Sequence, residues 1–154
     1  MSRSISGFLA AAVVAAGCSS GVTRPSPGNA PLRVSVVQNP TLVAGTAVFT
    51  IPVDNISDSV VNLTFPSTCQ VLPYFTDRSG RSVTPVGGGF VCATVVTNQT
   101  LPRGGSFTQT YTVKPGTSPD AQFVVLPPGE YQVRGRLDDT TYRLESDPVA
   151  FTLQ

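Results

Sequence analysis

Residues 128–137 read Pro-Gly-Glu-Tyr-Gln-Val-Arg-Gly-Arg-Leu and give the clearest indication of the fold. From Tyr131 to Leu137, apolar or small residues alternate with polar ones, which is the period of a half-buried β-strand. Tyr131 opens this strand two residues after a glycine. That arrangement is typical of a tyrosine corner, in which the hydroxyl bonds to the backbone upstream. An ordinary half-buried strand tyrosine is the alternative. The stretch therefore predicts a late strand of a β-sandwich.

Working outward, the same alternation returns in short segments separated by turn residues, with the spacing of a sandwich. The other predicted strands cover residues 32–36, 49–53, 61–65, 71–76, 81–85, 90–97, 107–113, 122–126 and 149–153. Pro52 lacks an amide hydrogen, so its strand should lie at an edge there or carry a bulge. We expect an all-β, Ig-like antiparallel β-sandwich of about seven to nine strands.

The composition argues against catalysis and against nucleic-acid binding. The chain has no histidine, so it lacks the usual general base of serine and cysteine hydrolases and the commonest zinc ligand. Ten basic and nine acidic residues nearly cancel, and loss of Arg3 with a leader would leave nine of each. No strong field would then attract a nucleic acid. We expect no enzyme activity, no cofactor and no nucleic-acid partner.

The aspartates raise the question of a calcium site. Asp138 and Asp139, together with Asp54, Asp58 or Asp147, offer carboxylate ligands, but no D-x-D-x-D-G loop surrounds them. We therefore expect solvated turn aspartates and no metal site.

Cys18 determines where we expect the protein to act. It follows Ala15-Ala16-Gly17, a single positive charge at Arg3 and an apolar run, a combination typical of a bacterial lipoprotein signal peptide. A plain secretory signal is the alternative, while the run is shorter than the ~20 residues of a spanning helix. We expect a signal peptide over 1–17, a lipidated Cys18 opening a flexible linker over 18–31, and one domain over 32–154.

This leader predicts a domain in the cell envelope, outside the cytoplasm and anchored to membrane lipid through Cys18. Ser19 stands where an aspartate is associated with inner-membrane retention, so the sequence is compatible with the outer membrane. Cys69 and Cys92 remain after lipidation and most simply form one disulfide in an oxidising compartment. Two free buried thiols are the alternative.

Residues 55–65 read Asn-Ile-Ser-Asp-Ser-Val-Val-Asn-Leu-Thr-Phe and resemble the opening run of the BsuPI-type proteinase inhibitors. Segments 74–77, 101–107 and 126–135 resemble later motifs of that family in the same order, so the resemblance spans about 48–153. It implies an Ig-like sandwich and, in the founding members, inhibition of an intracellular serine protease. The family's tryptophans are absent here and the leader predicts export, so the fold transfers better than the activity.

Two loops are candidates for binding a protease, because an inhibitor presents a rigid exposed segment. The first is 81–91, where Phe90 or Val91 would fill a specificity pocket; its alternative is an ordinary hairpin made mobile by three glycines. The second is 121–126, whose alternative is a buried strand. Our first hypothesis is a monomeric, non-enzymatic, membrane-anchored domain that binds an extracytoplasmic protein. The second is a serine-protease inhibitor in the periplasm or at the cell surface, and an enzyme ranks third.

Overall fold

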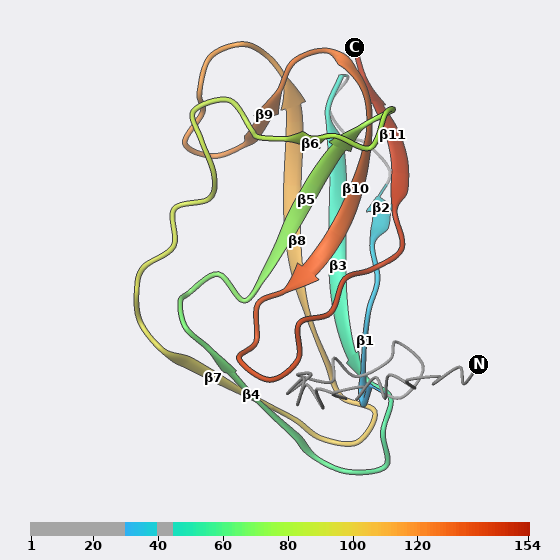
Figure 1. Cartoon of the computed structure of the whole chain (residues 1–154), viewed down its shortest axis with the longest axis vertical. Helices are drawn as coiled ribbons and strands as arrows, with labels where there is room; N and C mark the ends of the chain where they lie inside the picture. The colour runs from blue at the N-terminus through green and yellow to red at the C-terminus, as the bar shows by residue number, and fades with distance from the viewer. Residues whose placement is uncertain (1–29, 40–44) are drawn as a thin grey trace, which may run out of the picture.

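The computed structural model describes residues 30–39 and 45–154, and Figure 1 shows most of their strands running along the long axis of the molecule. The predicted signal peptide, Cys18 and nearly all of the linker lie outside the described residues and remain predictions. The described residues form eleven strands and contain no helix able to span a membrane. The strands are β1 (Leu32–Val34), β2 (Val37–Asn39), β3 (Ala47–Asn55), β4 (Val61–Phe65), β5 (Val71–Asp77), β6 (Ser82–Val83), β7 (Thr97–Leu101), β8 (Ser106–Pro115), β9 (Val124–Leu126), β10 (Gly129–Leu137) and β11 (Val149–Leu153).

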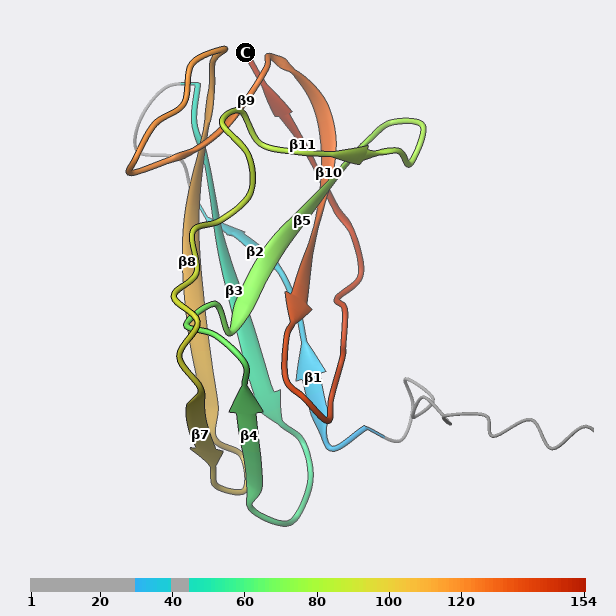
Figure 2. The ribbon, with the colours of Figure 1, turned by 60° about the vertical axis from the view of Figure 1, so that its left-hand side comes forward.

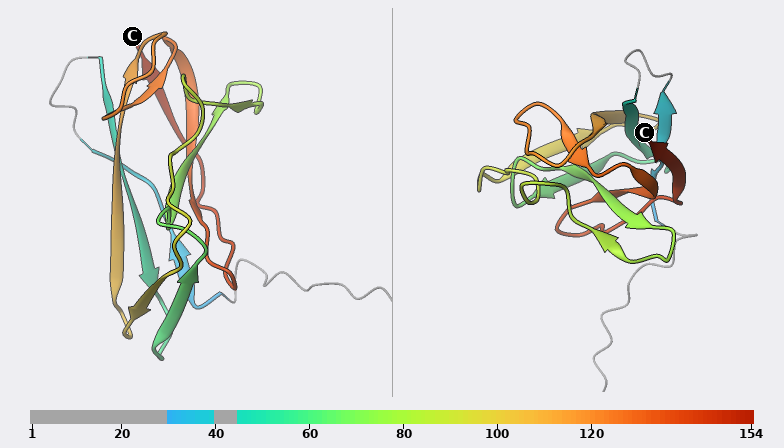
Figure 3. Two further views of the ribbon diagram at one scale, coloured as in Figure 1. Left: turned by 90° about the vertical axis from the view of Figure 1, so that its left-hand side faces the viewer. Right: turned by 90° about the horizontal axis from the view of Figure 1, so that it is seen from above.

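The strands form two facing sheets and a small ribbon (Figure 3). In the first sheet, β3 lies between β8 on one side and both β1 and β2 on the other, and β9 pairs with the far side of β8. The second sheet has the order β11-β10-β5-β6, and β4 and β7 pair separately. This is the all-β sandwich that the sequence predicts.

Three details differ from the sequence-based expectation. The strand count is higher, partly because the predicted strand over 32–36 is interrupted and the chain continues as β2. β9 pairs with β8 in parallel, since the loop over 116–123 carries the chain back before β9 begins. The strand predicted over 90–97 is wrong except at Thr97, where β7 begins, because residues 84–96 run from β6 to β7 without forming a strand.

Pro52 lies in the middle of its sheet and not at an edge. Its carbonyl accepts a hydrogen bond from the Ser35 N–H at 3.2 Å, so its nitrogen faces the same neighbouring segment. That segment is the interruption between β1 and β2, so no strand carbonyl there is left without a partner by the missing N–H of Pro52. A break in the neighbouring strand therefore accommodates the proline without a bulge in β3.

The sheets approach each other closely at Gly135 of β10. A Cβ atom there would lie 2.3 Å from Cγ2 of Ile51 in β3 and 3.2 Å from Cγ1 of Val34 in β1. Any larger residue would have to displace a packed core, which is destabilising. Gly135 therefore closes the sandwich on the side of β1 and β10.

Two buried clusters fill the space between the sheets. One includes Ile51, Leu63 and Phe65, and the other includes the rings of Phe49 and Phe151, which pack edge to face at 4.8 Å. Edge-to-face packing is a favoured arrangement for aromatic pairs.

Tyr131 makes the hydrogen bond expected of a tyrosine corner. Its hydroxyl donates to the carbonyl of Pro127, four residues upstream, at 2.7 Å. A Cβ atom on Gly129 would lie 3.2 Å from that hydroxyl, so a glycine here leaves room for the ring. The bond holds the turn between β9 and β10 closed.

Asn55 is a buried polar residue that joins three parts of the chain. Its amide nitrogen donates to the carbonyls of Ser59 at 2.7 Å, Leu101 at 3.0 Å and Pro102 at 3.0 Å. Its side-chain oxygen accepts from the N–H and the hydroxyl of Ser57. These bonds attach the end of β3 to the turn between β7 and β8.

Replacing Asn55 by alanine should therefore lower the free energy of unfolding by about 3 kcal/mol, because buried carbonyls would lose their donors. Urea unfolding would measure the change. Asn62→Ala is the matched control: Asn62 is exposed, bonds only the Thr100 hydroxyl at 3.0 Å, and should change stability by less than ~0.5 kcal/mol. Equal losses in the two variants would contradict this role for the Asn55 network.

Candidate functional site

The sandwich is not closed between β5 and β8. These strands belong to different sheets, and residues 84–96 cross the space between them, as Figure 2 shows. We call this space the open side and residues 84–96 the strap. The hydroxyl of Tyr111 on β8 reaches across and donates to the carbonyl of Val71 on β5 at 2.5 Å. The open side is therefore spanned by side chains and by the strap, without a ladder between strands.

The predicted disulfide between Cys69 and Cys92 is present and holds the strap. The two Cα atoms lie 5.4 Å apart, and the cysteines are 23 positions apart in sequence. Two hydrogen bonds lie beside it: the N–H of Thr68 donates to the Ala93 carbonyl at 3.1 Å, and the Ala93 N–H donates to the Thr68 hydroxyl at 3.0 Å. One covalent bond and two hydrogen bonds thus attach the strap to the start of β5.

The two residues proposed to fill a protease pocket point in different directions. Phe90 is half-buried, packs against the second core cluster, and meets the ring of Tyr111 edge to face at 5.4 Å. Val91 is fully exposed, with a relative accessibility of 101%. Phe90 therefore fills the open side, and only Val91 is free to meet a partner.

The two candidate loops lie side by side and frame one groove. The N–H of Val86 donates to the carbonyl of Val125 at 2.8 Å, which joins the strap to β9. A Cβ atom on Gly87 would lie 2.8 Å from the Cβ of Pro119, so this glycine is needed for the close approach of the loops. The groove has a volume of about 480 Å³ and its floor is Thr110–Thr112 of β8. Sequence reasoning found both loops but gave no signal that they meet.

Lys114 and Asp120 form an ion pair beside the groove. The Lys114 ammonium also lies 5.2 Å from the centre of the Phe123 ring, a cation–π contact. The hydrogen bond from Lys114, followed by that from the Gln122 N–H, holds the pKa of the Asp120 carboxyl below its usual range. The only lysine of the chain is thus neutralised locally, and the groove is lined mainly by valine, glycine, aromatic, proline and threonine residues, with Asp120 as the one charged residue among those described.

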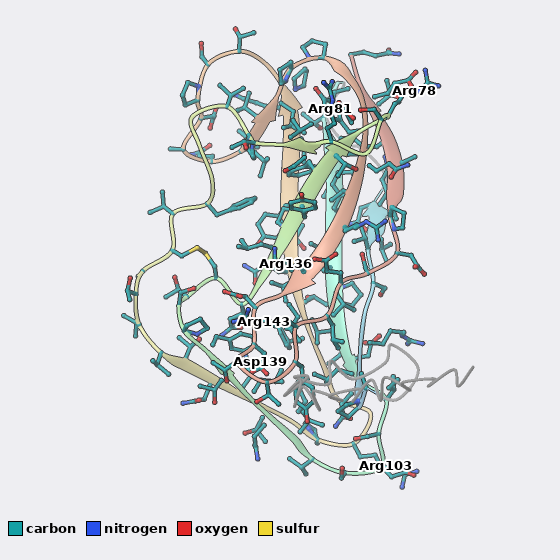
Figure 4. The ribbon with its side chains drawn as sticks, in the orientation of Figure 1. Arg78, Arg81, Arg103, Arg136, Asp139 and Arg143 are labelled. Atoms are coloured by element: carbon teal, nitrogen blue, oxygen red, sulfur yellow. A yellow bond between two sulfur atoms is a disulfide. The ribbon has the colours of Figure 1, made fainter. Side chains whose placement is uncertain are left out.

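The arginines do not gather at the groove. Figure 4 shows those labelled spread from one end of the molecule to the other. Arg78 pairs with Glu130 at 2.6 Å and Arg81 with Asp77 at 2.8 Å, both near the turn between β5 and β6. Their charge is therefore matched where they stand, and no extended basic surface forms there.

Asp139 corrects one of our expectations. It is buried, with 1% relative accessibility, and is not a solvated turn residue. Its carboxylate accepts from the N–H groups of Thr64 at 2.6 Å, Thr141 at 2.8 Å and Tyr142 at 2.7 Å, which fixes the loop after β10 against β4. Across residues 30–39 and 45–154, no group of three or more His, Cys, Asp or Glu residues could hold a metal ion. Sequence reasoning missed Asp139 because a turn pattern does not reveal which loop packs over it.

Comparison with known proteins identifies no family. No family model matches the chain, and no curated protein matches it. Among solved structures, a β-glucosidase from Erythrobacter marinus is 14% identical with a TM-score of 0.42, and the match covers 80% of this chain and 15% of that enzyme. A β-glucosidase from Kluyveromyces marxianus is 13% identical with a TM-score of 0.41, covering 80% and 14%. The structural genomics target SoR45 is 15% identical with a TM-score of 0.34, covering 80% and 86%. The chain thus spans about one seventh of the enzymes it matches, and these likenesses carry no argument about function.

The pKa of Tyr111, whose side chain spans the open side, can be measured. Burial raises the pKa of its hydroxyl to about 12, because the ionised form would lose its hydration. Since the folded pKa exceeds the unfolded value near 10, the contribution of Tyr111 to stability is complete below about pH 10 and is lost as the pH rises toward 12. Burial also raises the pKa of Tyr131, so the ultraviolet absorbance of tyrosinate at high pH should include a step near pH 12 that Tyr111→Phe reduces by the contribution of one tyrosine. That variant should also lose about 1 kcal/mol of stability with the bond to Val71. An unchanged titration would contradict this assignment.

Proposed function

We propose that this chain is a non-enzymatic, membrane-anchored lipoprotein whose sandwich binds an extracytoplasmic protein at the open side. The observation that carries the proposal is the set of exposed apolar side chains on the strap. Val95 and Val96 are 56% and 64% exposed, and Val91, four positions before Val95, is fully exposed. Apolar side chains gathered on one exposed segment mark interaction surfaces more often than scattered ones do. The adjoining groove adds a concave surface lined by both apolar and polar residues.

The disulfide supports this assignment because it limits the conformations of the strap. A segment fixed near its binding conformation loses less conformational entropy on binding than a free loop. The lack of histidine and the leader pattern support the non-enzymatic and extracytoplasmic parts of the proposal, as argued from the sequence.

Crosslinking in intact cells tests the binding surface. A photo-crosslinking amino acid placed at Val95 should capture a protein partner. The same amino acid at Val37 on β2 is the matched control, because Val37 is an equally apolar residue that is 50% exposed on the opposite edge of the first sheet. Capture from neither position, or from both equally, would contradict a partner at the open side.

Serine-protease inhibition is the second candidate, and one observation favours it. Val91 is fully exposed directly before Cys92, so the disulfide restrains the segment next to a side chain that is free to enter a specificity pocket. We expect stoichiometric inhibition of a subtilisin-like enzyme if this function holds. Val91→Asp should then weaken inhibition by ~30-fold or more, the effect of losing a central anchor. Val37→Asp should leave inhibition unchanged. No inhibition by the intact, oxidised protein would reject this candidate and leave the first one standing.

A further inference from the structure

The outer edge of β8 is unpaired over most of its length. β8 has ten residues, but β9 pairs with only its last three, Val113–Pro115. Within the part of the chain that the structure describes, no strand pairs with this edge from Ser106 to Thr112. Proteins usually protect such edges with charges, prolines or bulges. This stretch, Ser-Phe-Thr-Gln-Thr-Tyr-Thr, contains no charge or proline, and its register with β3 is unbroken.

The backbone groups at this edge can be assigned from its two ends. The Gly105 carbonyl accepts from the Asn55 N–H on the β3 side at 2.8 Å, whereas the Gly116 N–H donates to the Leu126 carbonyl on the β9 side at 2.9 Å. Backbone groups alternate in direction along a strand, so the even-numbered residues face away from β3. The residues that present an N–H and a carbonyl outward are Ser106, Thr108, Thr110 and Thr112.

The facing edge of β5 differs. The Asp77 N–H donates to the Arg81 carbonyl at 2.9 Å, which shows that odd-numbered residues of β5 direct their backbone toward β6 and the free edge. Pro73 shares this direction, so the edge of β5 lacks a donor there. Of the two edges that border the open side, only β8 presents an uninterrupted row of donors and acceptors.

We propose that the protein partner binds as an extended, uncharged segment that adds a strand to the outer edge of β8 and places a bulky apolar side chain in the groove. This inference rests on the proposed function and specifies how the partner is held. The main-chain bonds of such a complex supply affinity, while pockets along the edge select side chains. The segment pairs along at most the stretch from Ser106 to Thr112, because β9 occupies the edge beyond.

Charge and shape both match this occupant. The edge carries no charged side chain, and Lys114 and Asp120 at its upper end already neutralise each other. The groove lies at the end of the free edge, over Thr110–Thr112, with Phe90 and Phe123 among its lining residues. A strand pairing with Thr110 and Thr112 therefore passes along this groove, whose lining mixes polar and apolar residues. The one charged residue among the described lining residues, Asp120, is already paired with Lys114, so a charged side chain entering the groove would be desolvated without a partner.

Amide exchange of the full chain in detergent micelles tests this inference. The probes are capped, uncharged seven-residue peptides of threonine and valine with a central phenylalanine or leucine. By NMR, the amides of Thr108, Thr110 and Thr112 should exchange fast in the free protein and ~10-fold or more slowly with peptide. The amides of Gln109 and Tyr111, which face β3, should be protected in both states. The same peptides N-methylated at alternate residues should give no protection, because their donors are missing along one edge.

Two variants of Thr110 distinguish the contribution of its backbone N–H to peptide binding from that of its side chain. Thr110→Pro removes one outward N–H without removing a backbone bond to β3 and should weaken peptide binding ~10-fold or more, whereas Thr110→Val keeps the N–H and should change binding by less than ~3-fold. Both variants lose the hydrogen bond between the Thr110 and Thr50 hydroxyls at 3.2 Å, so that loss cancels in the comparison. Near-ultraviolet circular dichroism checks that both fold, and the N-methylated peptides supply the same test if Thr110→Pro does not. Equal binding by both variants, or no protection by any peptide, overturns the inference. A partner still captured from Val95 in Thr110→Pro would leave the proposed function intact and reject only the added strand.

Discussion

The close approach of the two sheets at Gly135 is the constraint on which the rest of this structure depends. With no side chain at that position, β10 rests against Ile51 and Val34, and the sandwich closes along the side of β1 and β10. Within the described residues no ladder joins the first and second sheets on either side, and on the side of β5 and β8 the rings of Tyr111 and Phe90 fill the space between them. On the side of β1 and β10 the sheets therefore approach closely because Gly135 has no side chain. On the side of β5 and β8, aromatic rings fill the space and the outer edge of β8 pairs with no described strand from Ser106 to Thr112. Every feature assigned to the candidate site lies on this second side.

Local patterns predict much of this fold, because alternation and turn residues act over a few positions. The bounds of β4 match the predicted strand, and those of β5 and β11 match it within one residue, since each alternates cleanly and is bounded by turn or proline residues. The hydrogen bond of Tyr131 and the pairing of Cys69 with Cys92 were also predictable from local spacing and cysteine count. The error at 90–97 has a plain cause: an apolar, β-branched run fits a strand only where another strand lies beside it, and that depends on the whole topology.

The candidate site was harder to predict than the fold because it is assembled from distant segments. Gly87 of the strap and Pro119 of the loop before β9 are 32 positions apart in sequence, and the contact of the two segments depends on Gly87 lying against Pro119. The free edge of β8 is likewise invisible in its own sequence, which looks like any other strand. It becomes apparent only from the pairing of β9 with the last three residues of β8. Sequence reasoning named both loops and proposed Phe90 or Val91 as the residue that enters a pocket; in the structure Phe90 packs against Tyr111 and Val91 is exposed.

The disulfide separates folding from binding competence. Neither core cluster contains a cysteine, so reduction of the thiols removes no contact within the core, and its cost of about 2–5 kcal/mol acts through the less constrained unfolded chain. The reduced chain would lose the only covalent attachment of the strap, and with it the fixed position of Val91 and the wall of the groove. The proposed recognition surface would then depend on the oxidation state of the compartment: in a reducing environment the strap would lack its cross-link, and oxidation would complete the surface without changing a core contact.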